Sequence, residues 1–369
     1  MLARRHLPPS GTDRAHRHRI TSIDLSAIAI VAFIVLLHVV GWGTLIALIV
    51  PQHLSVGSRA FGIGAGITAY SLGMRHAFDA DHIAAIDNTT RKLLGEGQRS
   101  ASVGFWFSFG HSSVVFGLAV LISFGMRSLS AHVVDAGSTL RALTSVLGAV
   151  VSSVFLYAIA ALNVAAFYDL YAAFRAMRTG RYDEAQLERR LESRGLVARV
   201  LAPLMRIVRK PGQMYFVGLL FGLGFDTATE IALLVLTGSG AASGLPWYAI
   251  LCLPVLFAAG MLLFDTIDGS FMHVAYGWAL ARPVRKIYYN LVVTGLSIGV
   301  ALVIGTVEVL GLLNRALGTH GAAGTWLATL DLNDLGFAIV GLFVATWAVS
   351  IAIWKVGRFE QRWAVGRDA

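Results

Sequence analysis

Long apolar runs recur along almost the whole of this 369-residue chain. An α-helix needs about 20 consecutive apolar residues to cross the hydrocarbon core of a bilayer. Only 14% of the residues are charged, whereas a soluble protein carries about a quarter. The runs cover residues 24–50, 60–88, 101–126, 139–170, 214–237, 246–279, 284–313 and 335–357. We therefore predict an all-α polytopic membrane protein, with eight transmembrane helices in a single integral membrane domain over residues 1–369.

The basic residues predict how these helices are oriented. If the N-terminus lies inside, all but five of the 30 lysines and arginines fall in cytoplasmic segments, including a basic loop over residues 172–213. This asymmetry follows the positive-inside rule and puts both termini in the cytoplasm. The net charge of +9 is then explained by membrane orientation, so we expect the lipid bilayer and no nucleic acid as a partner. The inner, cytoplasmic membrane of a prokaryote is the expected location.

Several kinds of chemistry are not encoded. The single cysteine, Cys252, excludes an intramolecular disulfide and a site built from several thiolates. No Gly-x4-Gly-Lys-Ser/Thr run is present, so the chain itself does not hydrolyse ATP, and no His-Glu-x-x-His pattern of a zinc protease occurs. We therefore expect no enzyme activity and no resident cofactor. The sequence does not indicate an oligomeric state.

The second apolar run contains a dense group of ionisable residues, His-Ala-Phe-Asp-Ala-Asp-His at positions 76–82. An aspartate near the centre of a membrane helix costs about 2.5–3.5 kcal/mol on insertion scales. Imidazole and carboxylate are ligands of divalent metal ions, so these residues predict a metal site.

At about 100° per residue, His76, Asp79 and His82 share a broad helix face, and Asp81 lies almost opposite. Either the helix unwinds around Asp79–His82, or Asp81 orients a metal ligand without binding the ion itself. A polar network between helices without an ion is the alternative.

Other runs carry candidate partners for this group. Asp226 and Glu230 are four residues apart and share a helix face, where a cation or a proton would relieve their repulsion. Asp265 belongs to another same-face acidic pair, with Asp268. His111 is followed by two serines, which suits either a metal ligand or a hydrogen bond between helices. His38, in the middle of the first run, is a further candidate. The predicted metal residues are thus His76, Asp81, His82, Asp79, His38, His111, Asp226, Glu230 and Asp265.

Short matches hint at an internal repeat. Phe78-Asp79 and Phe225-Asp226 lie in the second and fifth runs, and Ile83-Ala84 and Ile231-Ala232 follow them. The two runs cross the predicted membrane in opposite directions. An inverted repeat of this kind is common among secondary transporters.

Four ordered motifs resemble those of the nickel/cobalt transporter (NiCoT) permease family. They are His-x4-Asp-His within residues 76–82, residues 109–115 with Ser113 where threonine is usual, residues 223–230, and residues 260–268. The resemblance implies uptake of Ni²⁺ or Co²⁺ across the cytoplasmic membrane through eight helices with both termini inside. It gives His76, Asp81 and His82 the role of recognising the metal. His38 and Phe78 resemble the branch of the family that takes both ions.

We therefore predict a secondary-type permease whose substrate is a divalent nickel or cobalt ion. An inside-negative potential favours cation uptake by about 2.3 kcal/mol per charge per 100 mV. The alternatives are an efflux carrier and an intramembrane metalloenzyme or non-transporting sensor. Metal exporters often carry a long histidine-rich cytoplasmic loop, and residues 175–210 contain no histidine.

Overall fold

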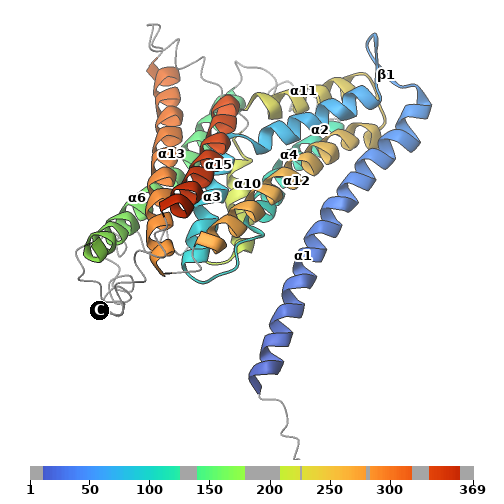
Figure 1. Ribbon diagram of the computed structural model, residues 1–369. Coiled ribbons are helices and arrows are strands. Elements are labelled where there is room, and N and C mark those ends of the chain that lie inside the picture. Colours follow the sequence, from blue (N-terminus) through green and yellow to red (C-terminus); the bar gives the residue numbers. More distant parts are fainter. Residues whose placement is uncertain are drawn as a thin grey trace, which may run out of the picture.

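The computed structural model describes residues 11–124, 139–178, 208–224, 227–279, 283–317 and 332–357. Over these residues the chain is helical except for short connections and one hairpin (Figure 1). The hairpin pairs β1 (Ser55–Val56) with β2 (Arg59–Ala60) in antiparallel register. The predicted all-α class is confirmed for this part of the chain.

Six helices are close to the predicted runs. They are α1 (Gly11–Gly43), which continues as a π-helix (Thr44–Ile49) and a 3-10 turn (Val50–Gln52), α4 (Val103–Ser123), α6 (Thr139–Arg178), α12 (Trp247–Ala279), α13 (Pro283–Leu317) and α15 (Leu332–Gly357). In the described residues, five helical segments are long and apolar enough to cross a membrane: Leu25–Gln52, Val103–Ser123, Ala142–Ala172, Trp247–Gly277 and Leu291–Asn314. This establishes a multi-pass membrane protein. Residues 179–207, most of the predicted cytoplasmic loop, lie outside the described residues.

The second and fifth predicted spans are each interrupted. The second consists of α2 (Ile63–Ala77) and α3 (Ala80–Gly95), and the fifth consists of α10 (Met214–Phe221) and α11 (Ala228–Ala242). Asp79 is extended, with φ −66° and ψ 141°, and its carboxylate accepts a hydrogen bond from the Ala80 backbone N–H. Such side-chain capping offers the backbone an alternative to a continuous helix. Each of the runs over 60–88 and 214–237 is thus divided into two helices. Of the two alternatives predicted around Asp79–His82, the structure shows the unwound helix.

The two interrupted helices run in opposite directions. The Tyr248 hydroxyl, just after α11, donates to Gln52 just before α2, at 2.9 Å. At the other end of the bundle, the Lys92 ammonium on α3 donates to the Val208 carbonyl just before α10, at 2.7 Å. Asp79 and Thr227 cap α3 and α11 in the same extended conformation. The equivalent third positions of these helices are then His82 and Glu230.

Glycines bring the two interrupted helices into backbone contact with their neighbours α4 and α12. A Cβ on Gly110 of α4 would overlap the carbonyl oxygen of Tyr215 on α10. Three further contacts of this kind join α4 to α10 and α2 to α12: Gly218 with Phe107, Gly260 with Tyr70, and Gly73 with Phe257. Because glycine has no Cβ, helices approach closely at such points. α4 also meets α12 at Gly104, and α6 meets the residues after α10 where Gly148 faces Gly224.

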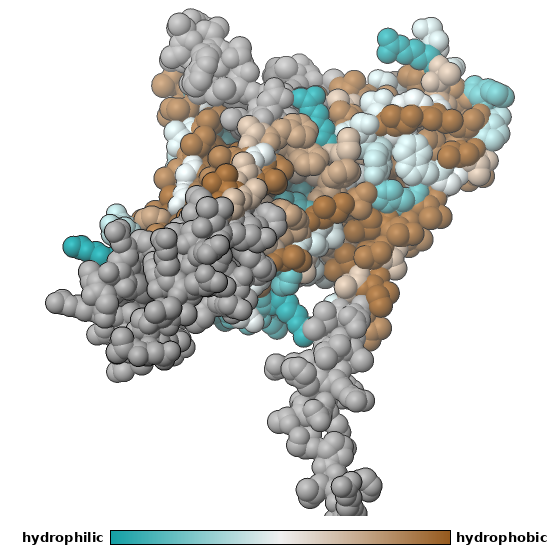
Figure 2. All heavy atoms as spheres, in the orientation of Figure 1, coloured by the Kyte–Doolittle hydropathy of each residue, from teal (hydrophilic) through white to brown (hydrophobic). Residues whose placement is uncertain are grey.

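The outer surface of the bundle is apolar, as Figure 2 shows for one face. α1 lies at the edge of the bundle (Figure 1), and many of its side chains are exposed, among them Leu25, Ile28, Val31 and Val39 at 58–67%. Lipid chains cover such surfaces in a membrane protein. The polar side chains treated next are buried within the bundle.

Candidate metal site

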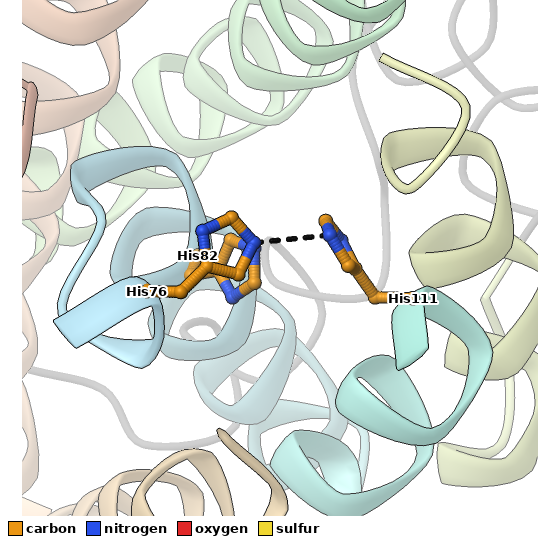
Figure 3. Close-up of side chains that lie close together, drawn as sticks. All are labelled: His76, His82 and His111. Atoms are coloured by element: carbon orange, nitrogen blue, oxygen red, sulfur yellow. Dashed lines mark hydrogen bonds between the residues drawn. The ribbon is translucent and has the colours of Figure 1, made fainter. Parts of the chain in front are cut away.

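Three buried histidines from α2, α3 and α4 lie close together at the interruption between α2 and α3. His76 lies in the last turn of α2, His82 in the first turn of α3 and His111 near the middle of α4. One ring nitrogen from each lies within 4.8 Å of the others. Figure 3 shows the three rings turned toward one another. Each is at most 3% exposed.

Two of the histidines are held by their Nδ1 atoms. The Nδ1 atom of His76 lies 3.0 Å from the Thr229 hydroxyl on α11, and that of His82 lies 3.2 Å from a carboxylate oxygen of Asp265 on α12. A metal-ligating histidine commonly donates its second ring N–H to such a partner, which fixes the tautomer and the ring orientation. With Nδ1 as the donor, Nε2 keeps its lone pair. The Nε2 atom of His82 is buried and has no hydrogen-bond partner among the described residues.

Glu230 provides an oxygen beside these nitrogens. Its Oε1 atom lies 2.7 Å from Nε2 of His111 and 3.9 Å from Nε2 of His76. The Thr227 hydroxyl donates to its other oxygen at 3.0 Å. Glu230 is completely buried. A buried carboxylate at this distance from imidazole is a suitable ligand or counter-charge for a divalent cation.

The nitrogen spacing fits two ligands of one ion. The Nε2 atoms of His76 and His111 are 3.0 Å apart. Nitrogens about 2.1 Å from a shared ion are about 3.0 Å apart at a right angle and about 3.4 Å apart at the tetrahedral angle. The pair is therefore spaced like neighbouring ligands of a square-planar or octahedral ion, geometries that include those of Ni²⁺.

Asp265 orients the His82 ring through its contact with Nδ1. It also accepts a short hydrogen bond from the Ser108 hydroxyl on α4, one helical turn before His111. Its other oxygen is buried without a partner among the described residues. The sequence pattern did not single out Ser108, although its three-residue spacing from His111 places both on one helix face.

Asp79 and Asp81 lie on either side of the interruption. Besides capping α3, Asp79 has an oxygen 4.0 Å from Nδ1 of His76. Asp81 accepts a hydrogen bond from the His82 backbone N–H at 2.9 Å and lines the same cavity as His76 and His82. Because the helix is broken, Asp81 no longer lies opposite the histidines as it would on a continuous helix.

Two predicted residues are not in this group. His38 is bonded elsewhere: its Nε2 atom lies 3.2 Å from the Tyr70 hydroxyl and its Nδ1 atom 2.8 Å from the Ile34 carbonyl oxygen. The structure therefore does not bring His38 to the three histidines. Asp226 lies outside the described residues.

Helix ends add to the electrostatics. The C-terminal ends of α2 and α10 reach the cavity at His76 and Phe221, and a helix C-terminus carries a partial negative charge that favours cations. The positive N-terminal ends of α3 and α11 are offset by acidic residues in their first turns, Asp81 and Glu230. Discontinuous helices with this arrangement are typical of transporter binding sites.

A small cavity adjoins the histidines. It offers about 20 Å³ to water-sized occupants, enough for about one water molecule or ion. The lining residues come from α2, α3, α4, α6, α11, α13 and the residues around the end of α10: His76, Asp81, His82, His111, Gly148, Ala149, Ser152, Phe221, Gly224, Thr227, Glu230 and Glu308. Sequence patterns alone assigned no role to Ser152 or Glu308.

Comparisons with known proteins identify the family. Residues 62–353 match the model of a family described as "High-affinity nickel-transport protein". The chain belongs to this family. It is 58% identical over 337 residues to "Nickel transporter NicT" of Mycobacterium tuberculosis, with 91% of each chain covered. It is 43% identical to "Nickel transporter NixA" of Staphylococcus aureus, with 92% of this chain and 97% of the relative covered.

A third relative is named for a different metal ion. "Cobalt transport protein NhlF" of Rhodococcus rhodochrous is 38% identical, with 90% of this chain and 92% of the relative covered. No solved structure matches the chain. Because the family and these relatives are transport proteins, the chain is a membrane transporter and not an enzyme.

Proposed function

We propose that this chain takes up Ni²⁺, with Co²⁺ as a second substrate, across the cytoplasmic membrane. His76, His82, His111 and Glu230 bind the ion. The observation that carries the proposal is the orientation of two histidines. Thr229 and Asp265 hold the Nδ1 atoms of His76 and His82, which leaves both Nε2 lone pairs for an ion.

The ligand types suit the proposed ions. Imidazole nitrogen binds nickel and related first-row ions well, and no thiolate is present that would favour softer ions. Cu²⁺ binds such ligands more tightly than Ni²⁺. Selectivity therefore comes from ligand geometry and from the supply of each metal.

The remaining predicted residues have supporting roles in this proposal. Asp265 orients His82, Asp79 holds the start of α3, and Asp81 contributes negative charge to the cavity wall. Asp226, which directly precedes Thr227 in the sequence, remains a candidate source of negative charge. His38 acts through Tyr70 on α2, at a distance from the ion.

Uptake follows from the proposed topology. Eight helices in one transporter domain, with both termini in the cytoplasm, place most basic residues inside, as the positive-inside rule requires. α2–α3 and α10–α11 supply the second and fifth spans as interrupted helices. A divalent ion gains about 4.6 kcal/mol on entering a cell held at 100 mV inside-negative, which is twice the value for a single charge. The carboxylates of the site offset the cost of the ion within the membrane.

Dual specificity has two supports. The relatives include proteins named for nickel and for cobalt, and the resemblance places His38 and Phe78 in the branch that takes both ions. Phe78 forms the interruption between α2 and α3, where its ring stacks on Phe337 of α15 with centroids 4.9 Å apart. It can therefore influence the ligands through the position of the interruption.

The test is accumulation of radioactive nickel and cobalt by cells that express the chain. His76→Ala removes a proposed ligand and should abolish accumulation. The matched control is His53→Asn in the exposed hairpin region, where the left-handed backbone (φ 47°) suits asparagine. If wild-type cells accumulate no more metal than cells without the chain, the proposed function is wrong. If His76→Ala cells accumulate metal at the wild-type level, the ligand set is wrong.

A further inference from the structure

Glu308 is a buried carboxylate on a helix that none of the four sequence motifs includes. It lies on α13, where its neighbours in sequence are apolar, and is 7% exposed. A carboxylate within the membrane is costly and commonly marks a substrate or ion path. Glu308 therefore calls for a functional explanation beyond helix packing.

The carboxylate is held in place by two hydroxyls from α6. Ser152 donates to one of its oxygens at 2.7 Å and Ser153 to the other at 2.9 Å. A side chain held in this way keeps its negative charge aimed in one direction.

Glu308 lines the same cavity as the histidines. His76, His82, His111 and Glu230 form one part of its wall, and Ser152 and Glu308 form another. The unpartnered Nε2 atom of His82 belongs to a residue of this wall. The cavity thus joins a carboxylate of the α6–α13 pair directly to the proposed ligands.

Glu308 lies at a depth similar to that of the proposed ligands. Its hydrogen-bond donor Ser152 lies thirteen residues after the start of α6, and His76 lies thirteen residues after the start of α2. In the proposed topology both helix starts face the outside. Glu308 and the histidines therefore lie at a similar distance from the outer surface of the membrane.

We infer that Glu308, oriented by Ser152 and Ser153, binds the divalent cation from the α6–α13 side of the cavity that His76, His82, His111 and Glu230 also line. This inference rests on the proposed uptake function. It assigns a substrate-binding role to the α6–α13 pair, which otherwise only packs beside the site. The ligand class is a hard or borderline divalent cation that accepts carboxylate and hydroxyl oxygens.

Kinetics of nickel uptake test the inference. Glu308→Gln keeps the shape and hydrogen-bond acceptance of the side chain but removes its charge, so we expect KM for Ni²⁺ to rise by about tenfold or more with maximal uptake little changed. Glu308→Asp keeps the charge and should stay closer to the wild type. The matched control is Thr306→Val, which removes the other hydroxyl contact between these helices, Tyr157 to Thr306 at 2.9 Å, on the exposed surface. It should leave KM unchanged.

A structural role gives a different result. If Glu308 only joins the helices, Glu308→Gln lowers the amount of folded protein and maximal uptake with KM unchanged, and the inference is overturned. Wild-type KM together with wild-type maximal uptake in Glu308→Gln also overturns it.

Calorimetric titration of Ni²⁺ into the purified protein in detergent tests the same site without transport. Glu308→Gln should weaken Ni²⁺ binding by about tenfold or more, and Thr306→Val should bind as the wild type does. Equal affinities for Glu308→Gln and the wild type overturn the inference. If wild-type cells take up no nickel, the proposed function fails, and this titration still reports whether Glu308 binds the ion.

Discussion

The Nε2 atoms of His76 and His111 lie 3.0 Å apart, although the two residues come from different helices and Glu230 approaches the same His111 atom to 2.7 Å. The three atoms thus come from α2, α4 and α11 and lie close together at one point within the bundle. The proposed ion would bind at this point, where the three side chains already converge.

The contact between Asp265 and His82 should control affinity for the ion. Asp265→Asn keeps the size of the side chain but weakens the orientation of the imidazole, so we expect Ni²⁺ binding to the purified protein to weaken by about 10–100-fold. Isothermal titration calorimetry in detergent measures this directly. Ser270→Ala, which alters a peripheral contact of the same helix with Ala101, should bind as the wild type does. Equal affinities for Asp265→Asn and wild type would contradict the role of Asp265.

Asp79 should act both as a helix cap and as a source of negative charge. Asp79→Ala should lower stability by about 0.5–2 kcal/mol, and Asp79→Ser should recover most of that loss because serine also caps helices. Thermal unfolding in detergent measures stability. Ni²⁺ binding should stay weakened in both variants, because the carboxylate near His76 is absent. If serine restores binding as well as stability, Asp79 has only the capping role.

The close approach of α4 to α12 should depend on glycine. A methyl group on Gly104 would overlap the Asp265 carbonyl oxygen, so Gly104→Ala should destabilise the protein by about 1–3 kcal/mol and disturb Asp265. Gly117→Ala on the same helix is the control, because nothing lies within 4 Å of the added carbon. A comparison of the two unfolding temperatures is sufficient. Equal temperatures would mean that α4 and α12 do not pack as described.

Phe78 should affect metal preference only through the helix interruption. Its ring packs on Phe337 and on Phe264, with a 5.6 Å separation of centroids for the second pair. We expect Phe78→Val to change the ratio of nickel to cobalt uptake in a competition assay, and Phe337→Val to change it in the same direction. If neither variant alters the ratio, the argument for dual specificity from Phe78 fails. A change in Phe78→Val alone would mean that the ring itself contacts the ion.

The proposed orientation can be tested by labelling on either side of the interrupted span. Ser58 in the hairpin and Gln98 after α3 are both exposed and lie before α2 and after α3. In a Cys252→Ala background, Ser58→Cys should react with an impermeant thiol reagent in intact cells. Gln98→Cys should react only after the cells are opened. The reverse pattern would invert the topology and contradict uptake in the proposed direction.

Sequence patterns singled out most of the ionisable side chains that the structure brings together, but not the contacts between them. Ionisable residues within apolar runs are informative by themselves, which is why His76, His82, His111, Glu230 and Asp265 were all candidates. The pairing between them was not predictable, because Asp265 is 183 residues from His82 and Thr229 is 153 residues from His76. Contacts of this kind depend on helix packing, for which one sequence carries no direct signal.

The interruptions show where periodicity misleads. Apolar runs over 60–88 and 214–237 predicted two membrane spans, but hydropathy does not register a change of backbone direction within a span. The local sequence signal for the first interruption is Asp79, which caps the start of α3 by accepting a hydrogen bond from the Ala80 backbone N–H. The Ile-Ala matches of the internal repeat are in register with the two helix starts, whereas the Phe-Asp matches are displaced by one residue. His38 was a candidate by residue type alone, and the nearby Tyr70 hydroxyl provides its partner.

The contact of Gly148 with Gly224 has a mechanical consequence for the α6–α13 pair. Two glycines meet there without interdigitating side chains, so a change in the angle between α6 and the interrupted α10–α11 helix breaks no rotamer packing at that point. On α4, backbone contacts with α10 and α12 on both sides resist sliding. Because a methyl group on either glycine would overlap the Cα atom of the other, the Gly148–Gly224 contact sets how closely α6 approaches the end of α10 at the wall of the cavity.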